Sequence, residues 1–193
     1  MQTASLVNFT NAIHQLTPAE QEAFAQGWIP LTVKRKTILT AAGETERYLY
    51  FVTEGVQRAF YLGDDNNEAT IVFTYPPSFS GVADSFLTQT PSLYFFETLT
   101  ASSFLRISYD NISQLMYTWP AIQQLVLKAT ALALKGTLMR HAELQCFTNE
   151  QKFTTLLKRS PHILQLVPHK YLASYLGMDA SNFSKLMNSI KIQ

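Results

Sequence analysis

The chain has 193 residues, of which 47% are hydrophobic and 15% are charged. This composition is typical of a globular protein of one or two domains and excludes a disordered chain. No apolar run approaches the roughly 18 residues that span a bilayer, and the start lacks the features of a signal peptide. We therefore expect a cytoplasmic protein with no membrane partner.

A single cysteine, Cys146, further limits the chemistry of the chain. It excludes an internal disulfide, a four-cysteine zinc site and a redox iron–sulfur centre within one chain. We expect its thiol to be a small buried apolar group.

The net charge of +1 conceals an asymmetry between two parts of the chain. Residues 1–119 carry 6 Lys and Arg against 11 Asp and Glu, a balance of −5. Residues 120–193 carry 9 against 3, a balance of +6. A basic segment attached to an acidic one favours a phosphate-binding module at the C-terminal end. Chance clustering on solvated faces is the alternative.

The first part of the chain changes from helical to strand patterning. Apolar residues three and four apart predict helix over residues 5–27, with Thr17 as the N-cap of a second short helix. From residue 28 to 108, β-branched and aromatic stretches alternate with turn signals, which predicts a β-barrel or jelly roll. The predicted strands are 31–34, 37–39, 48–52, 57–62, 69–74, 95–100 and 103–108.

Residues 76–87 interrupt this strand pattern with a glycine-containing turn and a short helical pattern from Val82 to Leu87. A turn that leads into a helix can hold an anion on its backbone N–H groups. The simpler interpretation, which we favour for this segment alone, is a connector packed by its own aromatic side chains. Asp110 is predicted to cap the helix that follows the last strand.

The longest helical pattern follows Pro120 and extends to about Gln145. Its apolar residues step 3, 4, 3, 4 and 3 positions apart, a heptad seam that predicts a dimer interface with the same helix of a second subunit. The predicted seam is Ile122, Leu125, Ala129, Leu132, Gly136 and Met139. A second stripe, expected to face the barrel, contains Val126, Ala133, Leu134 and Leu138. One buried helix within a monomer is the alternative.

The stretch 167–187 predicts two short amphipathic helices that meet at Gly177, a residue that can end a helix in the left-handed conformation. The second helix has a polar outer face. Its predicted buried face is Phe183, Leu186, Met187 and Ile190. Two helices joined by a short turn with glycine are typical of a helix-turn-helix, whose second helix enters the major groove of DNA. An ordinary helical hairpin is the alternative.

The polar face of this second helix supplies candidate DNA contacts. Ser181 and Asn182 can hydrogen-bond base edges, Asn best with adenine, and Lys185 can reach a guanine or a phosphate. Side chains of the preceding helix are expected to contact the DNA backbone. The full predicted DNA-binding set is His169, Lys170, Ser174, Ser181, Asn182, Ser184 and Lys185.

Catalytic, metal and cofactor chemistry find no support in the sequence. No Ser/His/Asp or Cys/His constellation appears. Residues 28–118 contain no histidine, which argues against a cupin-like enzyme because a cupin metal site needs several histidines in its barrel. A haem sensor would need axial ligands there as well. We expect the protein not to be an enzyme and to hold no metal or cofactor.

The order of these segments resembles the CRP/FNR family of bacterial transcription regulators. The resemblance covers nearly the whole chain and is most specific at 48–55 and 167–186. It implies an α+β fold with a cyclic-nucleotide-binding-like sensory barrel (1–119), a long dimerisation helix (120–146) and a helix-turn-helix DNA-binding domain (147–193). It also implies a homodimer that binds palindromic double-stranded DNA. An unidentified small-molecule effector and RNA polymerase are further candidate partners.

The insert departs from the pattern of family members that bind cyclic nucleotides. Those members have a Gly-Glu pair that holds the ribose and a later Arg that pairs with the phosphate. Here Gly81 is followed by Val82, and 90–94 contains no cation. We therefore expect weak or no cyclic AMP binding and a pocket that is apolar or filled by its own side chains. The predicted effector pocket is Phe79, Gly81, Val82, Asp84, Ser92, Leu93 and Tyr94.

The C-terminal segment departs from the family as well. Ala180 and Ser181 stand where catabolite-activator-like members have Arg and Glu, so we expect a different DNA sequence to be recognised. The chain ends at Gln193, and we expect a short member without the hairpin wing of longer ones. The sequence thus predicts a homodimeric DNA-binding transcription regulator with an effector-binding or vestigial barrel. The alternative is a small-molecule-binding module whose helix-turn-helix no longer recognises DNA.

Overall fold

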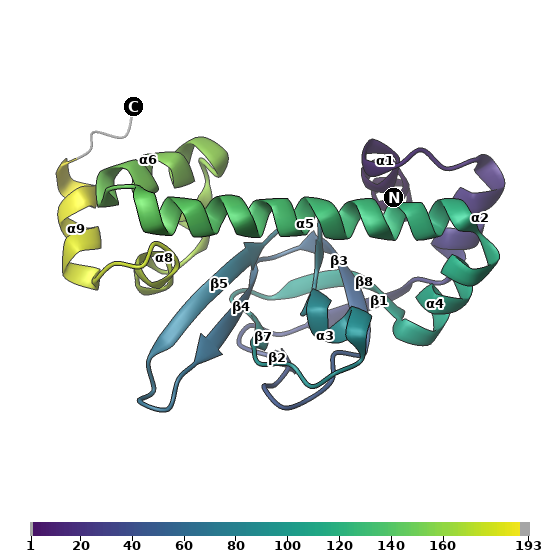
Figure 1. Ribbon diagram of the computed structural model, residues 1–193, viewed down its shortest axis with the longest axis horizontal. Coiled ribbons are helices and arrows are strands. Elements are labelled where there is room, and N and C mark those ends of the chain that lie inside the picture. The colour runs from purple at the N-terminus through teal and green to yellow at the C-terminus, as the bar shows by residue number, and fades with distance from the viewer. Residues whose placement is uncertain (1, 190–193) are drawn as a thin grey trace.

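The computed structural model describes residues 2–189. A β-barrel lies below one long helix, α5, with helical segments at both of its ends (Figure 1). The N-terminal helices gather at the start of α5 and the C-terminal helices gather at its end. The predicted α+β architecture, a barrel followed by a long helix and C-terminal helices, is confirmed.

The elements follow one another in the order helices, barrel, helices. Their bounds are α1 (Gln2–Ile13), α2 (Pro18–Gln26), β1 (Ile29–Val33), β2 (Ile38–Thr40), β3 (Tyr48–Glu54), β4 (Gln57–Leu62), β5 (Glu68–Thr74), β6 (Ser78–Ser80), α3 (Ala83–Thr88), β7 (Phe95–Thr98), β8 (Ser102–Ser108), α4 (Tyr109–Thr118), α5 (Pro120–Cys146), α6 (Asn149–Arg159), α7 (Ile163–Leu166), α8 (His169–Tyr175) and α9 (Ala180–Ser189).

The barrel consists of two four-stranded antiparallel sheets with strand orders β1-β8-β3-β6 and β2-β7-β4-β5. The predicted hairpin over residues 63–67 joins β4 to β5. Strand β6 was missed by sequence reasoning, because its three residues, Ser-Phe-Ser, lack the β-branched run that marks the other strands. It pairs with β3 and carries the chain from the sheet into the insert helix α3.

Capping residues define several helix starts. Thr17 forms the predicted capping box with Glu20, and Thr148 forms a second one with Gln151 at the start of α6. The prediction that Asp110 caps α4 was wrong. The N-cap is Ser108, whose hydroxyl accepts the backbone N–H of Asn111.

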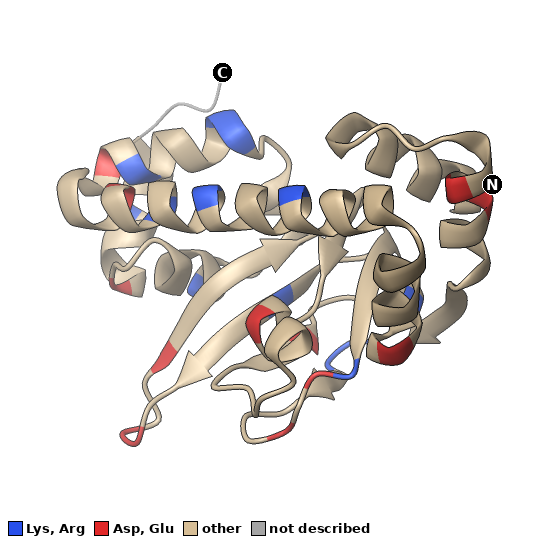
Figure 2. Ribbon diagram, turned by 45° about the vertical axis from the view of Figure 1, so that its right-hand side comes forward, with Lys and Arg blue, Asp and Glu red and all other residues tan. Residues whose placement is uncertain are grey.

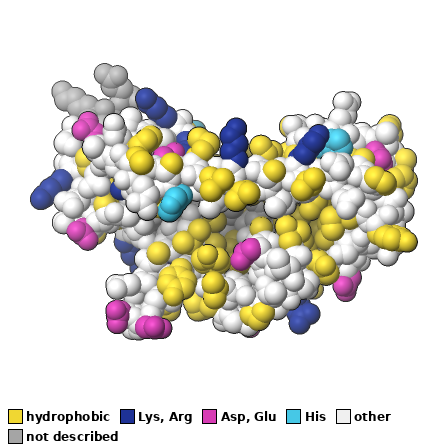
Figure 3. Space-filling model, in the orientation of Figure 1, with side chains coloured by type: hydrophobic (Ala, Val, Ile, Leu, Met, Phe, Trp, Pro, Cys, Tyr) yellow, Lys and Arg dark blue, Asp and Glu magenta, His cyan; other side chains and the backbone are white. Residues whose placement is uncertain are grey.

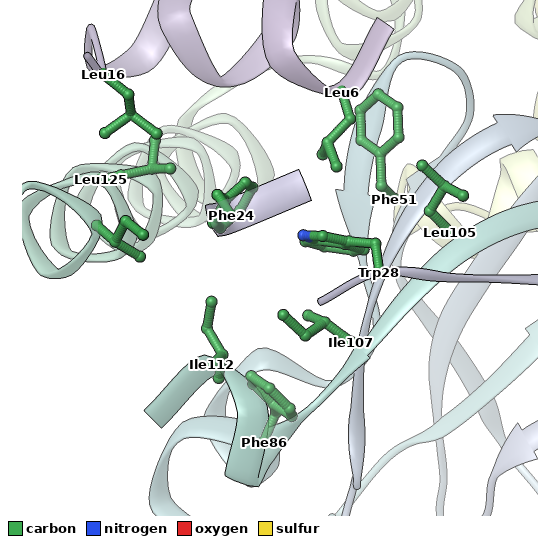
Figure 4. Close-up of a cluster of buried hydrophobic side chains, with 11 residues drawn as sticks. Leu6, Leu16, Phe24, Trp28, Phe51, Phe86, Leu105, Ile107, Ile112 and Leu125 are labelled. Atoms are coloured by element: carbon green, nitrogen blue, oxygen red, sulfur yellow. The ribbon is translucent and has the colours of Figure 1, made fainter. Parts of the chain in front are cut away.

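The two faces of the barrel wall bury different side chains because successive residues of a strand point to opposite sides. On β3, Tyr50 and Val52 point into the barrel and pack with Phe96 and Phe104. Phe51, between them, points outward into the core that the N-terminal helices, α4 and α5 form with the barrel wall (Figure 4). The barrel interior is therefore filled largely by its own aromatic rings.

The long helix α5 packs against the rest of the chain through the first residues of the stripe that sequence periodicity assigned to a dimer. Ile122 and Leu125 are 0% and 1% exposed in the core with α1 and α2, so their assignment to a dimer interface was wrong. Leu134 and Leu138, expected against the barrel, are 57% and 60% exposed. Each stripe is divided along the helix, since Leu132 and Met139 of the predicted dimer seam are exposed while Val126 of the other stripe packs against the core. The apolar spacing alone does not say which residues face the rest of the chain.

Three further observations concern the cysteine, membrane-spanning helices and metal ligands. The side chain of Cys146 is exposed, so the expectation that it is buried was wrong. No helix within residues 2–189 is long and apolar enough to cross a membrane. Within the same residues, no group of three or more His, Cys, Asp or Glu side chains is placed to hold a metal ion.

Candidate functional site

Helices α8 and α9, which we call the C-terminal helix pair, meet at Gly177, whose φ of +61° is the left-handed value predicted for this turn. The N–H of Gly177 donates to the carbonyl of Ser174, and the next N–H donates to Ala173. The buried rings of Phe153 and Phe183 pack edge to face at 5.5 Å beneath the turn. The pair is thereby set in a fixed mutual orientation, as a helix-turn-helix requires.

The outer face of α9 is exposed. Ser181, Asn182 and Lys185 are exposed, and within residues 2–189 their side chains form no hydrogen bond or ion pair. Ser184 is also exposed, but its hydroxyl donates to the carbonyl of Ala180 within the helix. Leu186 and Met187, which belong to the predicted buried face of α9, are partly buried behind the outer face. Ile190, predicted on the same buried face, lies outside the described residues.

The side chains of α8 that were predicted to contact DNA differ in their surroundings. His169 is exposed and lies against the ring of Phe183 at 5.4 Å, and Lys170 is exposed with its ammonium over Tyr171. Ser174, in contrast, accepts the N–H of Thr70 and donates to the carbonyl of Glu68, both at 2.9 Å. The prediction of a DNA contact at Ser174 was wrong, because this hydroxyl attaches α8 to strand β5.

Arg58, a fully buried arginine, completes this junction between barrel and helix pair. Its guanidinium pairs with Glu97 at 2.5 Å and with both oxygens of Glu68 at 2.5 and 2.8 Å. It lies between the rings of Phe60, 4.1 Å away, and Tyr171, 3.7 Å away. Hydrogen bonding from Arg58 lowers the pKa of Glu68, so the pair stays ionised near neutral pH.

Contacts on both sides extend the junction. Phe73 of β5 packs on Tyr175 at 5.2 Å, and the barrel residues Val56 and Leu99 belong to the hydrophobic core of the C-terminal helices. From α5, the guanidinium of Arg140 donates to the carbonyl of Tyr175 and contacts its ring. Barrel, long helix and C-terminal helix pair are thus coupled, so a displacement of β5 would reach α8 directly.

Replacing Ser174 by Ala tests the junction at a single atom. We expect the amide hydrogen of Thr70 to exchange with solvent roughly 5- to 30-fold faster, since loss of its part-buried hydrogen bond to Ser174 costs about 1–2 kcal/mol of local stability. Ser184→Ala, which removes a hydroxyl bonded only within α9, is the matched control and should leave Thr70 unchanged. Equal exchange at Thr70 in wild type and Ser174→Ala would show that α8 is not attached there.

The predicted effector residues do not form one pocket. Phe79 packs in the helix-facing core against Phe9 and Trp28, while Asp84 and Leu93 are exposed, so these three assignments were wrong. Their side chains leave the barrel because β6 directs Phe79 outward and the insert presents its polar side to solvent. The remaining four lie on the barrel side. They are Gly81, Val82, Ser92 and Tyr94.

Glu46, which sequence reasoning missed, lies where the insert meets the barrel. Its carboxylate accepts the hydroxyl of Thr40 at 2.7 Å and the N–H of Val82 at 3.3 Å. Gly81 has a φ of +114°, a backbone conformation that favours glycine, and a Cβ added there would lie 3.3 Å from the carbonyl of Tyr48 and 3.5 Å from Glu46 Oε2. Burial raises the pKa of Glu46. The carboxylate of Glu46 therefore already accepts the hydrogen bond of the backbone N–H at the start of the insert helix.

Charged residues are distributed unevenly between the barrel and the helices (Figure 2). Basic residues lie along α5 and the C-terminal helices, acidic residues mark the hairpin tip and α2, and the rest of the barrel carries both signs. Part of the basic excess is neutralised internally, because Glu143 accepts hydrogen bonds from both Arg140 and Arg159. Lys185 on α9 has no such partner among the described residues.

The chain is similar to known proteins in the sequence of its barrel and in its overall fold. Residues 30–118 match the family model of the cyclic nucleotide-binding domain. No curated protein sequence matches the chain. Among solved structures, FixK2 from Bradyrhizobium japonicum is 14% identical, covers 83% of either chain and superposes with a TM-score of 0.74.

Two other solved structures show the same likeness. A regulator from Eubacterium rectale assigned to the CRP/FNR family is 15% identical over 90% of this chain and 82% of its own, with a TM-score of 0.69. The c-di-GMP responsive global regulator CLP from Xanthomonas campestris is 18% identical over 89% of this chain and 90% of its own, with a TM-score of 0.67. At these identities the likeness concerns the fold.

Proposed function

We propose that this chain is a homodimeric, DNA-binding transcription regulator. Its residues 30–118 belong to the cyclic nucleotide-binding domain family, and its fold is that of CRP/FNR regulators. Residues 147–193 recognise DNA, residues 120–146 carry the dimer contact, and residues 1–119 form the sensory or vestigial part. The observation that carries this proposal is the uncovered polar face of α9, held on a helix-turn-helix by a buried core.

Each exposed side chain of α9 has a role that its chemistry supports. Asn182 can pair with the edge of an adenine and Ser181 can bond either kind of base. Lys185, one turn further along the helix, can reach a guanine or a phosphate, and His169 and Lys170 lie at the start of α8 where the DNA backbone would pass. Binding to a palindromic duplex should therefore weaken steeply as salt rises, and retention of affinity at high salt would argue against the proposal.

Dimerisation is supported by an apolar surface on α5 that nothing in the described chain covers. At about 3.6 residues per turn, Leu127, Leu134 and Leu138 fall on the side of the helix opposite Ile122 and Arg140, which are buried. With Ala131 they form the outward stripe, spaced 4, 3 and 4 positions apart as in a coiled coil. We propose that this stripe, rather than the seam read from the sequence, is where two α5 helices pack.

An apolar groove on the barrel-facing side of α5, away from the outward stripe, offers a second apolar surface to a partner copy. It lies between α3, α5 and the barrel wall, with a volume of about 130 Å³. Figure 3 shows hydrophobic side chains gathered along the hollow beneath α5. A contiguous exposed apolar surface of this kind is typical of a protein–protein interface.

Cyclic AMP is not expected to be the effector. The carboxylate of Glu46 occupies the N–H of Val82, and the hydroxyl of Ser92, at the position of the family's phosphate-binding Arg, bonds only to the backbone of Tyr94. A buried phosphate would meet a carboxylate and no cation there. Titration calorimetry with cyclic AMP should show no saturable heat in the micromolar range. Micromolar binding that is lost on Ser92→Ala would contradict this account of the insert.

A further inference from the structure

A second cavity opens at the mouth of the barrel, away from the C-terminal helices. Its volume of about 460 Å³ lies in the range of small-molecule sites. It is bounded by β2, the turn at 44–47, β3 and β8. We call this cavity the barrel-mouth pocket. Charged and aromatic side chains line it, chiefly Arg47, Arg106, Glu44, Glu46, Tyr48 and Tyr50.

Arg106 is the unusual member of the barrel-mouth pocket. Its Nε–H is buried and has no hydrogen-bond acceptor, and no carboxylate of the described residues lies within 4.0 Å of its guanidinium. The guanidinium rests over the ring of Tyr48, 4.3 Å from its centroid. Arg58, by contrast, is paired with two carboxylates. A buried guanidinium N–H without an acceptor is costly, and such groups in a folded protein call for an explanation.

The acidic neighbours of Arg106 are turned to other partners. Both carboxylate oxygens of Glu46 are engaged, one by Thr40 and Val82 and the other by the N–H of Tyr48. The carboxylate of Glu44 accepts the N–H of Ala41. Neither forms an ion pair with the guanidinium, so the positive charge of Arg106 lines a concave site without a carboxylate counter-charge among the described residues.

Tyr50 adds a second donor at the same place. Its side chain is 2% exposed and lies among the pocket-lining residues. Burial raises the pKa of Tyr50 well above its ordinary value, and the nearby Glu46 adds to the shift. The hydroxyl therefore keeps its proton and can donate a hydrogen bond.

We propose that the barrel-mouth pocket binds a small molecule through a terminal oxyanion, a carboxylate or a phosphate, held by the guanidinium of Arg106 and the hydroxyl of Tyr50. An oxyanion accepts from a guanidinium, and it would supply the counter-charge that Arg106 lacks among the described residues. The pocket adjoins the insert, because its lining residue Glu46 also accepts the N–H of Val82. The proposal concerns the barrel alone and does not depend on DNA binding, so its failure and that of the proposed function are separately visible.

The test follows the Nε–H resonance of Arg106 by nuclear magnetic resonance in the full chain without DNA. Inorganic phosphate and benzoate are added separately at constant ionic strength, with chloride as the balancing anion. We expect a saturable shift of this resonance with one of them. Saturation with phosphate alone assigns a phosphate-bearing ligand, and saturation with benzoate alone assigns a carboxylate.

Substitutions test whether the anion binds at the side chain of Arg106. Followed through the Tyr50 ring resonances, Arg106→Gln should weaken binding of the effective anion about tenfold or more, since a charge-assisted bond is lost. Arg106→Lys should retain part of it. Arg35→Gln, an equal charge change on an exposed turn outside the pocket, should leave binding within about twofold. The proposal is overturned if neither anion gives a saturable shift in the wild type, or if Arg106→Gln binds as the wild type does.

Discussion

Leu134→Lys is expected to convert the dimer into monomers. Two copies of this residue would meet at the outward stripe of α5, and burying an unpaired ammonium costs several kcal/mol. The dissociation constant of the dimer should therefore rise about a hundredfold or more. Sedimentation velocity over a range of protein concentrations measures this change. DNA affinity should fall in parallel, because one half-site alone holds a monomer weakly.

A second variant distinguishes the two faces of α5. Leu132→Lys introduces the same charge two residues earlier, at an exposed leucine of the seam that periodicity assigned to the dimer. Leu132 and Leu134 point in directions roughly 160° apart around the helix. If the outward stripe is the interface, Leu132→Lys stays dimeric. The opposite pattern, a dimer with Leu134→Lys and a monomer with Leu132→Lys, would contradict the proposed packing.

Lys185→Ala is expected to lower DNA affinity by about 1–3 kcal/mol if its ammonium reaches a base, which corresponds to roughly a 5- to 150-fold change. If it reaches a phosphate, the loss should be similar for all sequences, and the salt dependence should fall by about one ion. Fluorescence anisotropy at several salt concentrations separates the two cases. Asn182→Ala should relax the preference at one base pair.

The matched control for Lys185 is Lys158→Ala. Lys158 is likewise exposed, but it lies in the last turn of α6 rather than on the outer face of α9. Its removal takes away the same charge and should change affinity by no more than about 0.5 kcal/mol. Equal losses in the two variants would mean that the basic charge acts at long range, and that α9 makes no specific contact.

Local patterns predicted the elements of this fold well because each depends on neighbouring residues. Thr17 with Glu20 marks a helix start, Gly177 marks a helix end, and the alternation along residues 48–52 marks a strand with two buried faces. The polar face of α9 was predicted for the same reason, since Phe183 and its neighbours repeat with helical spacing.

The candidate sites were harder to predict because they depend on contacts between distant segments. Ser174 meets Thr70 across 104 residues, and Glu46 meets Val82 across 36. Neither spacing has a sequence signature. A weak signal did exist for Arg58 and Arg106, since a charged residue inside an otherwise apolar strand needs either a partner or a ligand. The orientation of α5 failed because both of its apolar stripes satisfy the same helical period.

The central claim, that two copies of α9 recognise a symmetric DNA site, is tested most directly by selection from random duplex DNA with the full chain at physiological salt. We predict an enriched motif of two inverted half-sites with centres about 10 base pairs apart, one helical turn of DNA. The motif should vanish with Leu134→Lys and weaken with Lys185→Ala. Enrichment of no motif by a folded, dimeric wild type would contradict the account and leave a binding module that does not recognise DNA.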